Sequence, residues 1–162
     1  MNFDATKKLE REVNRLVKNY PDKRSASLMV LHAIQEEFGY ISKDAEVWAA
    51  KKLDLRPINI HELVTFYPML RDHDPGKTVV RVCRTLSCAL AGSHKLYGHI
   101  CDKLGLDKKG HGLQRTKDGK YGVEFAECLA SCGTGPVMMC NDDFYEAVSN
   151  EESDVILKRY EE

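Results

Sequence analysis

Four of the six cysteines form two close pairs in the second half of the chain, and these pairs are the residues best suited to do chemistry. Cys83 and Cys88 have the spacing C-x4-C within CRTLSC, and Cys128 and Cys132 have the spacing C-x3-C within CLASC. Each pair follows a run rich in β-branched or aromatic residues, TVVRV or YGVEFAE, which is typical of a strand. Two thiol pairs at strand ends, brought together by the fold, predict a metal centre.

Four thiolates can hold either one Zn²⁺ ion or one iron–sulfur cluster, and the spacing alone leaves both open. Paired cysteines of structural zinc sites usually have two residues between them, although up to four occur. A single ion needs all four sulfurs within one small tetrahedron, whereas a [2Fe-2S] rhomb is longer and takes two sulfurs at each end. The gaps of four and three residues fit one pair per iron, on two strand-end loops that meet.

A [2Fe-2S] cluster would bring negative charge that the chain has to stabilise. Two ferric ions, two sulfides and four thiolates have a summed charge of -2, and reduction by one electron gives -3. The backbone N–H groups of residues 133–135, which directly follow Cys132, are expected to approach the sulfurs. Arg81 and Arg84 flank Cys83 and are expected to supply positive charge.

The other two cysteines and the histidines have plainer explanations. Cys101 lies on the apolar face of a predicted helix and Cys140 ends the run PVMMC, so both are expected to be small core residues. His32 is predicted to be a core or boundary residue, and His111 to be a solvated loop residue. The chain contains neither C-x-x-C nor C-x-H, so it lacks the signatures of thioredoxin-type catalysis and of a Rieske site.

Composition narrows the class of protein. With 162 residues, of which 43% are hydrophobic and 30% charged, the chain suits one domain or two small ones. A formal net charge of -1 gives no support to nucleic-acid binding. No apolar run approaches the roughly 20 residues needed to cross a bilayer, and the N-terminus lacks an apolar signal core. We therefore expect a complete cytosolic protein, whose cysteines serve metal binding, catalysis or packing rather than disulfides.

About the first 70 residues are predicted to be all-helical. Apolar residues recur at helical spacing over residues 4–20 and 24–38, and Gly39 is placed to cap the second of these helices. Ser42 is predicted to cap a third helix, which Pro57 stops.

A short fourth helix and a linker complete the first half. Asn59 and Glu62 have the three-residue separation of a capping box at the start of this helix. The apolar stretch VTFYPML is expected to pack against the second domain or against a partner subunit. The polar segment at residues 71–77 contains a proline and a glycine and is the predicted linker. We therefore expect a helical bundle domain at residues 1–71 and a second domain at residues 72–162.

Strands dominate the pattern after the linker. Four are predicted, at residues 79–82, 123–126, 136–140 and 144–148. A helix closed by Gly105 precedes a charged loop at 108–122, a tight hairpin falls at residues 141–143, and Ser149 with Glu152 forms a capping box for a final helix. This order predicts an α+β protein, in which a helical bundle precedes a thioredoxin-like domain with a four-stranded mixed sheet.

Four stretches of the chain resemble one family. LHAIQEEFGYIS, HELVTFYPML, VCRTLSCALAGS and ECLASCGTGPVMMCND are similar to the E subunit of bacterial NADH–quinone oxidoreductase, respiratory complex I, in the thioredoxin-like [2Fe-2S] ferredoxin family. The two cysteine spacings, with the GxxP and ND that follow them, are specific to this family. Relatives of the family also occur in NAD-linked hydrogenases and formate dehydrogenases, and the resemblance covers nearly the whole chain.

The resemblance implies both a cofactor and a partner. It implies a [2Fe-2S] cluster ligated by Cys83, Cys88, Cys128 and Cys132, which all match the motif of the family, and a partner subunit that carries the flavin and the NADH site. This chain has no G-x-G-x-x-G loop, so we expect an electron-carrying subunit without an active site of its own. We also expect no membrane insertion and a place in a complex at the inner, cytoplasmic face of the membrane, with self-association of the isolated chain left open.

Several alternatives stay open on the sequence alone. The chain also fits the equivalent subunit of an NAD-linked hydrogenase or formate dehydrogenase, a free-standing ferredoxin, or a zinc-stapled interaction module. The helical extension at the N-terminus argues against the free-standing carrier, which does not need one. The sequence gives neither the reduction potential nor the place of the cluster on the electron route.

Overall fold

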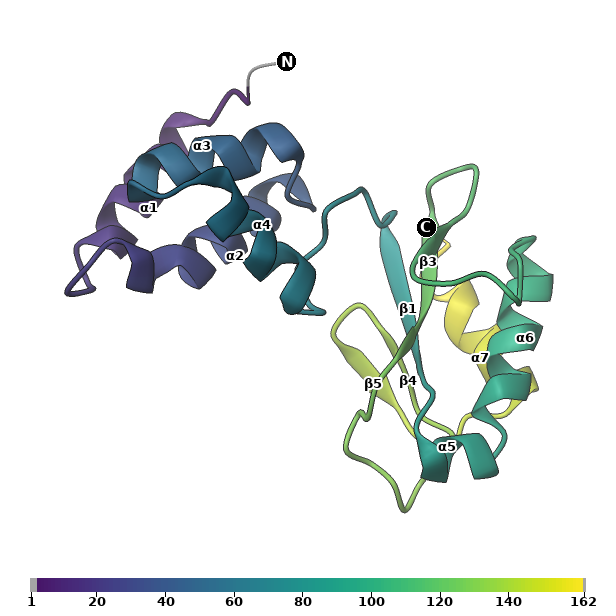
Figure 1. Cartoon of the computed structure of the whole chain (residues 1–162). Helices are drawn as coiled ribbons and strands as arrows, with labels where there is room; N and C mark the ends of the chain where they lie inside the picture. The colour runs from purple at the N-terminus through teal and green to yellow at the C-terminus, as the bar shows by residue number, and fades with distance from the viewer. Residues whose placement is uncertain (1–2, 162) are drawn as a thin grey trace. The chain divides into compact units, whose positions relative to one another are not determined.

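The computed structural model describes residues 3–161, and the chain divides into two compact units, Met1–Asp74 and Pro75–Glu162. The first unit is helical, whereas the second combines a sheet with helices (Figure 1). Among the described residues, no helix has both the length and the apolar character needed to cross a membrane.

The first unit is a bundle of amphipathic helices around one apolar core. Its elements in the described part of the chain are α1 (Lys7–Val17), η1 (Arg24–Ala26), α2 (Ser27–Phe38), α3 (Lys43–Leu53) and α4 (Pro57–Phe66). Buried side chains from all four α-helices, such as Leu9, Leu31, Leu53 and Ile60, form the core. The helical spacing of apolar residues over 4–20 and 24–38 is confirmed by α1 and α2, although Phe38 at the end of α2 is exposed.

Local capping signals place two helix ends correctly. Gly39 ends α2 in the left-handed region, at φ 81°, a conformation that glycine adopts without the steric cost of a Cβ. Ser42 caps α3 by accepting a hydrogen bond from the backbone N–H of Ala45. His32, by contrast, is exposed, because it lies on α2 beside the buried stripe that contains Leu31.

The predicted start of the fourth helix is wrong. Asn59 and Glu62 do not cap it, because α4 already begins at Pro57, and Asn59 is inside the first turn with its N–H donated to the carbonyl of Arg56 at 2.9 Å. Proline is favoured at the first position of a helix, because its fixed φ suits the helix and because an N–H at this position would have no acceptor within the helix. Pro57 therefore starts a helix, and α3 has already ended at Leu53.

The second unit is a five-stranded mixed sheet with helices. Its strands are β1 (Thr78–Cys83), β2 (Gln114–Arg115), β3 (Tyr121–Ala126), β4 (Met138–Cys140) and β5 (Asp143–Tyr145), and its helices are α5 (Leu86–Leu90), α6 (Ser93–Leu104) and α7 (Asn150–Lys158). The strand order is β2-β3-β1-β4-β5. Neighbours β1 and β3 are parallel and the other pairs are antiparallel, so the predicted class is confirmed with one strand more than expected.

The additional strand, β2, falls in the stretch that was expected to be a loop. Gln114 and Arg115 have little intrinsic strand preference, but the turn that follows them positions them against Val123 and Gly122 of β3. The hydroxyl of Thr116 fixes this turn, because it donates to the Asp118 carboxylate and accepts the N–H of Tyr121. Tertiary pairing therefore decides the conformation here, and local propensity does not.

The last two strands are shorter than predicted, although their hairpin is where it was expected. Cys140 pairs with Asp143, so residues 141 and 142 form the turn. Beyond Tyr145 the chain leaves the sheet, because Ala147 takes a left-handed conformation at φ 50° and donates its N–H to the carbonyl of Thr134 at 2.7 Å. This bond connects the end of β5 to the loop that precedes β4.

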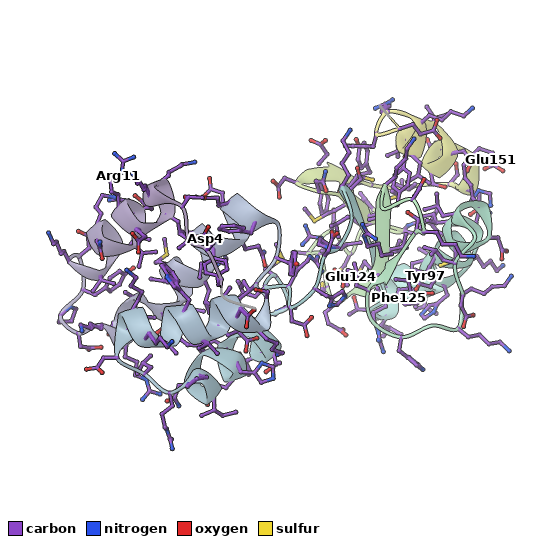
Figure 2. All side chains as sticks on the ribbon, turned by 90° about the horizontal axis from the view of Figure 1, so that it is seen from above. Asp4, Arg11, Tyr97, Glu124, Phe125 and Glu151 are labelled. Carbon is purple, nitrogen blue, oxygen red and sulfur yellow. The ribbon has the colours of Figure 1, made fainter. Side chains whose placement is uncertain are left out.

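Helices α6 and α7 pack against each other and share one core with the sheet (Figure 1). Tyr97 of α6 stacks on Phe125 of β3 with ring centroids 3.8 Å apart. Figure 2 labels both side chains in the view from above. Cys101 and Cys140 are fully buried in this core, as predicted, and Ser149 with Glu152 forms the expected capping box of α7.

Candidate metal centre

The parallel pairing of β1 and β3 brings one cysteine of each pair to the same edge of the sheet. Cys83 is the last residue of β1 and lies opposite Ala126, the last residue of β3, and Cys128 follows two residues later. The N–H of Arg84 continues this pairing beyond the strands by donating to the carbonyl of Ala126 at 2.9 Å. On the β4 side of β1, the N–H of Cys83 donates to the carbonyl of Val137 at 3.0 Å.

The second member of each pair follows at short range from a different local structure. Cys88 is on the short helix α5, and Cys132 is in the loop that leads to β4. The Cys128 and Cys132 sulfurs are 3.7 Å apart, and the thiols of Cys83 and Cys88 are near enough to shift each other's pKa. All four predicted cysteines therefore lie at one end of the sheet, as two pairs.

The two pairs differ in exposure. The exposed fractions of Cys83 and Cys88 are 1% and 2%, whereas Cys128 and Cys132 are both exposed. Val137 and Leu129 pack around the buried pair. A group held by all four sulfurs would therefore have one end in the protein and the other at the surface.

The arrangement of donors favours a long centre over a single ion. Within residues 3–161, no three His, Cys, Asp or Glu side chains surround one point closely enough to hold one metal ion. Each end of the site instead offers two thiols. This geometry suits a rhomb with one thiol pair per iron better than the compact tetrahedron that zinc requires.

Backbone N–H groups point at the sulfurs, but from residues that the sequence did not indicate. The N–H of Ala130 lies 3.3 Å from the Cys128 sulfur, and the N–H groups of Leu129 and Thr85 lower the pKa of Cys83. Ala130 makes this contact in the left-handed region, at φ 65°, which costs an alanine about 1–2 kcal/mol. Residues 133–135 were expected to donate, but the N–H of Thr134 bonds the carbonyl of Ser131 at 3.2 Å.

The two arginines that flank Cys83 have other partners. Arg81 is 7% exposed within β1, and its guanidinium donates to the carbonyl of Asn141 at 2.9 Å, in the β4–β5 hairpin. Arg84 lies 3.7 Å from the Glu127 carboxylate, which offsets its charge. Both guanidinium groups therefore have polar partners other than the sulfurs, and a supply of positive charge to the site by these arginines stays a prediction.

The four thiols influence each other's ionisation. Burial opposes ionisation of Cys83, but hydrogen bonds from the Thr85 hydroxyl and from N–H groups outweigh it and lower the pKa of Cys83. Burial and then the bond with Cys83 raise the pKa of Cys88. The N–H of Ala130 and the thiol of Cys132 lower the pKa of Cys128, whereas the bond with Cys128 raises the pKa of Cys132. Each pair thus contains one thiol that ionises more readily than its neighbour.

The loop that carries Cys132 is packed to fit these sulfurs. A Cβ on Gly135 would lie 3.3 Å from the Cys88 sulfur, so only glycine leaves the thiol its full space. Glu146 holds the same loop by accepting hydrogen bonds from the hydroxyls of Ser131 and Thr134, which lower the pKa of its carboxyl. The donor set and the space around it therefore fit a sulfur-ligated centre.

Thr85 is the residue of this site that the sequence analysis missed. Its hydroxyl lies 3.3 Å from the Cys83 sulfur and helps to lower the pKa of Cys128. A threonine two residues after the first cysteine was the available signal, because a hydroxyl at this short distance can donate a hydrogen bond to the sulfur.

Two thiol pairs at the ends of adjacent parallel strands define the class as thioredoxin-like proteins with a sulfur-ligated metal centre. Comparison with known proteins gives the particular family: the model of thioredoxin-like [2Fe-2S] ferredoxins matches residues 13–161, and the chain belongs to this family. The cofactor of the family is the [2Fe-2S] cluster, so this chain carries a [2Fe-2S] cluster.

Relatives of known name agree with this family. The chain is 34% identical to the NADH-quinone oxidoreductase E subunit of Aquifex aeolicus, over 98% of this chain and 96% of that protein. It is 31% identical to the corresponding E subunit of Mycobacterium tuberculosis over 93% of this chain, but spans 58% of that longer protein. A solved NAD+-reducing [NiFe]-hydrogenase, in the air-oxidized state, has a TM-score of 0.67 at 18% identity, over 80% of this chain and 22% of that one, and shares the fold.

Proposed function

We propose that this chain is an electron-carrying subunit of an NADH–quinone oxidoreductase and that Cys83, Cys88, Cys128 and Cys132 ligate its [2Fe-2S] cluster. The observation that carries the assignment is the meeting of two thiol pairs at the ends of β1 and β3, with no third metal-binding side chain at either pair among the described residues. The names of the relatives supply the parent complex.

The cluster, when bound, supplies one-electron redox chemistry. The residues of the chain hold it, exclude water from its inner end through the burial of Cys83 and Cys88, and donate hydrogen bonds to sulfur from Leu129 and Ala130. We assign no acid, base or nucleophile among the described residues, so the chain is an oxidoreductase subunit without an active site of its own.

The proposed partner is a subunit that binds NADH and a flavin. Hydride transfer delivers two electrons together, and a flavin can accept such a pair and release the electrons singly. We place the complex at the cytoplasmic face of the membrane. The hydrogenase shares the fold with this chain at low identity, whereas the named relatives reach 34% identity, so the quinone oxidoreductase is the favoured parent.

Metal analysis tests the cofactor and its stoichiometry. Protein made under iron-replete conditions is expected to contain about two iron atoms and two acid-labile sulfides per chain, because one thiol pair ligates each iron. Reduction with dithionite is expected to bleach the visible absorption and to produce a spin-half EPR signal. Stoichiometric zinc without sulfide would contradict the assignment and favour the zinc-stapled module.

We further propose that residues 1–71 and 72–162 are separate domains with different tasks. All four proposed ligands lie in the second, and the apolar side chains of Ile58, Phe66 and Met69, on α4 and just after it, are more than half exposed. An exposed apolar group of this kind suits a protein interface. The helical domain is therefore proposed to dock on the flavin-bearing partner.

Shortening the chain tests this division. Residues 72–162 alone are expected to fold and keep the cluster, but to bind the flavin-bearing partner at least about tenfold more weakly, because the exposed apolar side chains of the helical domain are lost. Cluster content and a pull-down on the partner are the measurements. The matched control is the full chain with Phe66→Ser, which keeps the helical domain and alters one exposed side chain. Full-strength binding by residues 72–162 would remove the docking role from the helices.

A further inference from the structure

Thr85 occupies a helix-capping position without using its side chain as a cap. It has the extended backbone of an N-cap, with φ -73° and ψ 166°, and its carbonyl accepts the N–H of Ala89 at 2.9 Å. Thr6, Ser42 and Ser149 occupy the same position on other helices, and each accepts a backbone N–H with its hydroxyl. The Thr85 hydroxyl makes no such capping bond in the described structure.

The hydroxyl of Thr85 is turned to sulfur instead. It lies 3.3 Å from the Cys83 sulfur, and it also helps to lower the pKa of Cys128, which belongs to the other thiol pair. Thr85 thus contacts one proposed ligand, Cys83, directly. A hydroxyl has a single proton to donate and two lone pairs that accept, so its role depends on which neighbours carry protons.

Binding of the cluster would fix the direction of this hydrogen bond. Between a thiol and a hydroxyl either atom can donate, and this is the case for Cys83 and Thr85 while the Cys83 thiol carries its proton. Metal ligation requires thiolates, which have no proton and can only accept. The Thr85 hydroxyl must then donate, and a hydrogen bond to an ionised acceptor is among the stronger ones in proteins.

We propose that Thr85 is a positioning residue that raises the reduction potential of the cluster by donating its hydroxyl proton to the sulfur of Cys83, at the same end of the sheet as the sulfur of Cys128. This inference rests on the proposed ligand set. One electron enters without a proton and takes the cluster charge from -2 to -3. A donor at the sulfurs stabilises the more negative, reduced state more than the oxidised state, so its removal favours oxidation.

The backbone limits the size of the effect. The N–H groups of Leu129 and Ala130 also donate to these two sulfurs, and no side-chain substitution at residue 85 removes them. Loss of the hydroxyl is therefore expected to change the ratio of reduced to oxidised cluster about tenfold at a fixed applied potential. For a one-electron couple this change corresponds to a midpoint potential lower by about 59 mV.

A redox titration of full-length variants, followed by visible absorption and EPR, tests the proposal. Thr85→Val keeps the shape of the side chain and lacks the hydroxyl, and Thr85→Ala lacks it while needing less space. Thr85→Ser restores the hydroxyl. We expect the valine and alanine variants to show the tenfold shift and the serine variant to titrate like the unaltered chain. Ser42→Ala is the control, because it removes a true capping bond and lowers stability without touching sulfur.

Each result decides the question. Valine and alanine variants with full cluster content and an unmoved midpoint would overturn the proposal, and so would a serine variant that shifts as far as they do. Loss of the cluster in all three variants would also overturn it, because Thr85 would then hold structure rather than set potential. Absence of a cluster from the unaltered chain would instead refute the proposed function.

Discussion

Serine in place of Cys83, Cys88, Cys128 or Cys132 is expected to remove the cluster absorption, or to perturb it severely. Serine offers a hard oxygen ligand where iron–sulfur chemistry prefers a soft thiolate. Changes in the groups around metal ligands already cost about 10–100-fold in affinity, so a ligand change is expected to cost at least that much. Iron content and the visible spectrum of each purified variant are the measurements.

The two pairs should respond differently in stability. Cys83 and Cys88 are buried, so a serine there also places a hydroxyl in an apolar site, at a cost of about 1–3 kcal/mol in the free energy of unfolding. Cys128 and Cys132 are exposed, and serine there should leave the metal-free chain as stable as before. Denaturant unfolding of the metal-free variants separates this effect from the loss of the cluster.

The remaining two cysteines provide the matched controls. Cys101 and Cys140 are fully buried in the core of the sheet, and burial, followed by the charge of Asp143, raises the pKa of Cys140 to about 12. A thiol with this pKa stays protonated near neutral pH and is not a ready ligand. Cys101→Ser and Cys140→Ser should therefore keep the spectrum and lose only stability. A cluster retained in Cys83→Ser but lost in Cys140→Ser would reverse the ligand assignment.

The second prediction is that the isolated chain stays oxidised under excess NADH and is bleached by dithionite. NADH delivers a hydride, and a one-electron cluster can accept these electrons only after a flavin or similar relay has separated the pair. The sequence has no glycine-rich phosphate-binding loop that would hold the dinucleotide. Absorption at the cluster bands under each reductant measures the difference, which should be nearly complete.

Addition of the flavin-bearing partner provides the control for this experiment. Reduction by NADH should appear in the mixture when the midpoint potential of the cluster is high enough, which the redox titration of the Thr85 variants measures independently. Prompt bleaching of the isolated, flavin-free chain by NADH would contradict the proposed division of labour, because the chain would then need a nucleotide site of its own.

The features that the sequence predicted well are those with local causes. Ser42 marks the start of α3 through its side-chain hydroxyl, and Gly39 marks the end of α2 because it has no side chain. The run TVVRV predicts a strand through its β-branched residues. The cysteine pairs were also placed together correctly, because parallel strands end at one edge of the sheet. The four ligand positions themselves stay a prediction that the serine variants will decide.

The features that the sequence missed depend on backbone directions and on distant pairing. Ala130 donates its N–H to sulfur only because it adopts a left-handed conformation, which no property of alanine indicates. Gln114 forms a strand only because β3 lies beside it. Arg81 was expected to supply charge at the cysteines, but its long side chain extends to the hairpin and donates to Asn141. The position of a residue in the sequence does not show where so long a side chain ends.

The parallel pairing of β1 with β3 also has a consequence for biosynthesis. The ribosome completes the first thiol pair at Cys88 and begins the second at Cys128, 40 residues later. Synthesis of these 40 residues takes roughly 2–8 s at about 5–20 residues per second. During that interval the nascent chain holds only half of the site, because the strand that delivers the other half has not left the ribosome. A scaffold that hands over a preassembled cluster can therefore complete the transfer only after β3 has emerged and paired, which makes cofactor insertion a late event in the maturation of this chain.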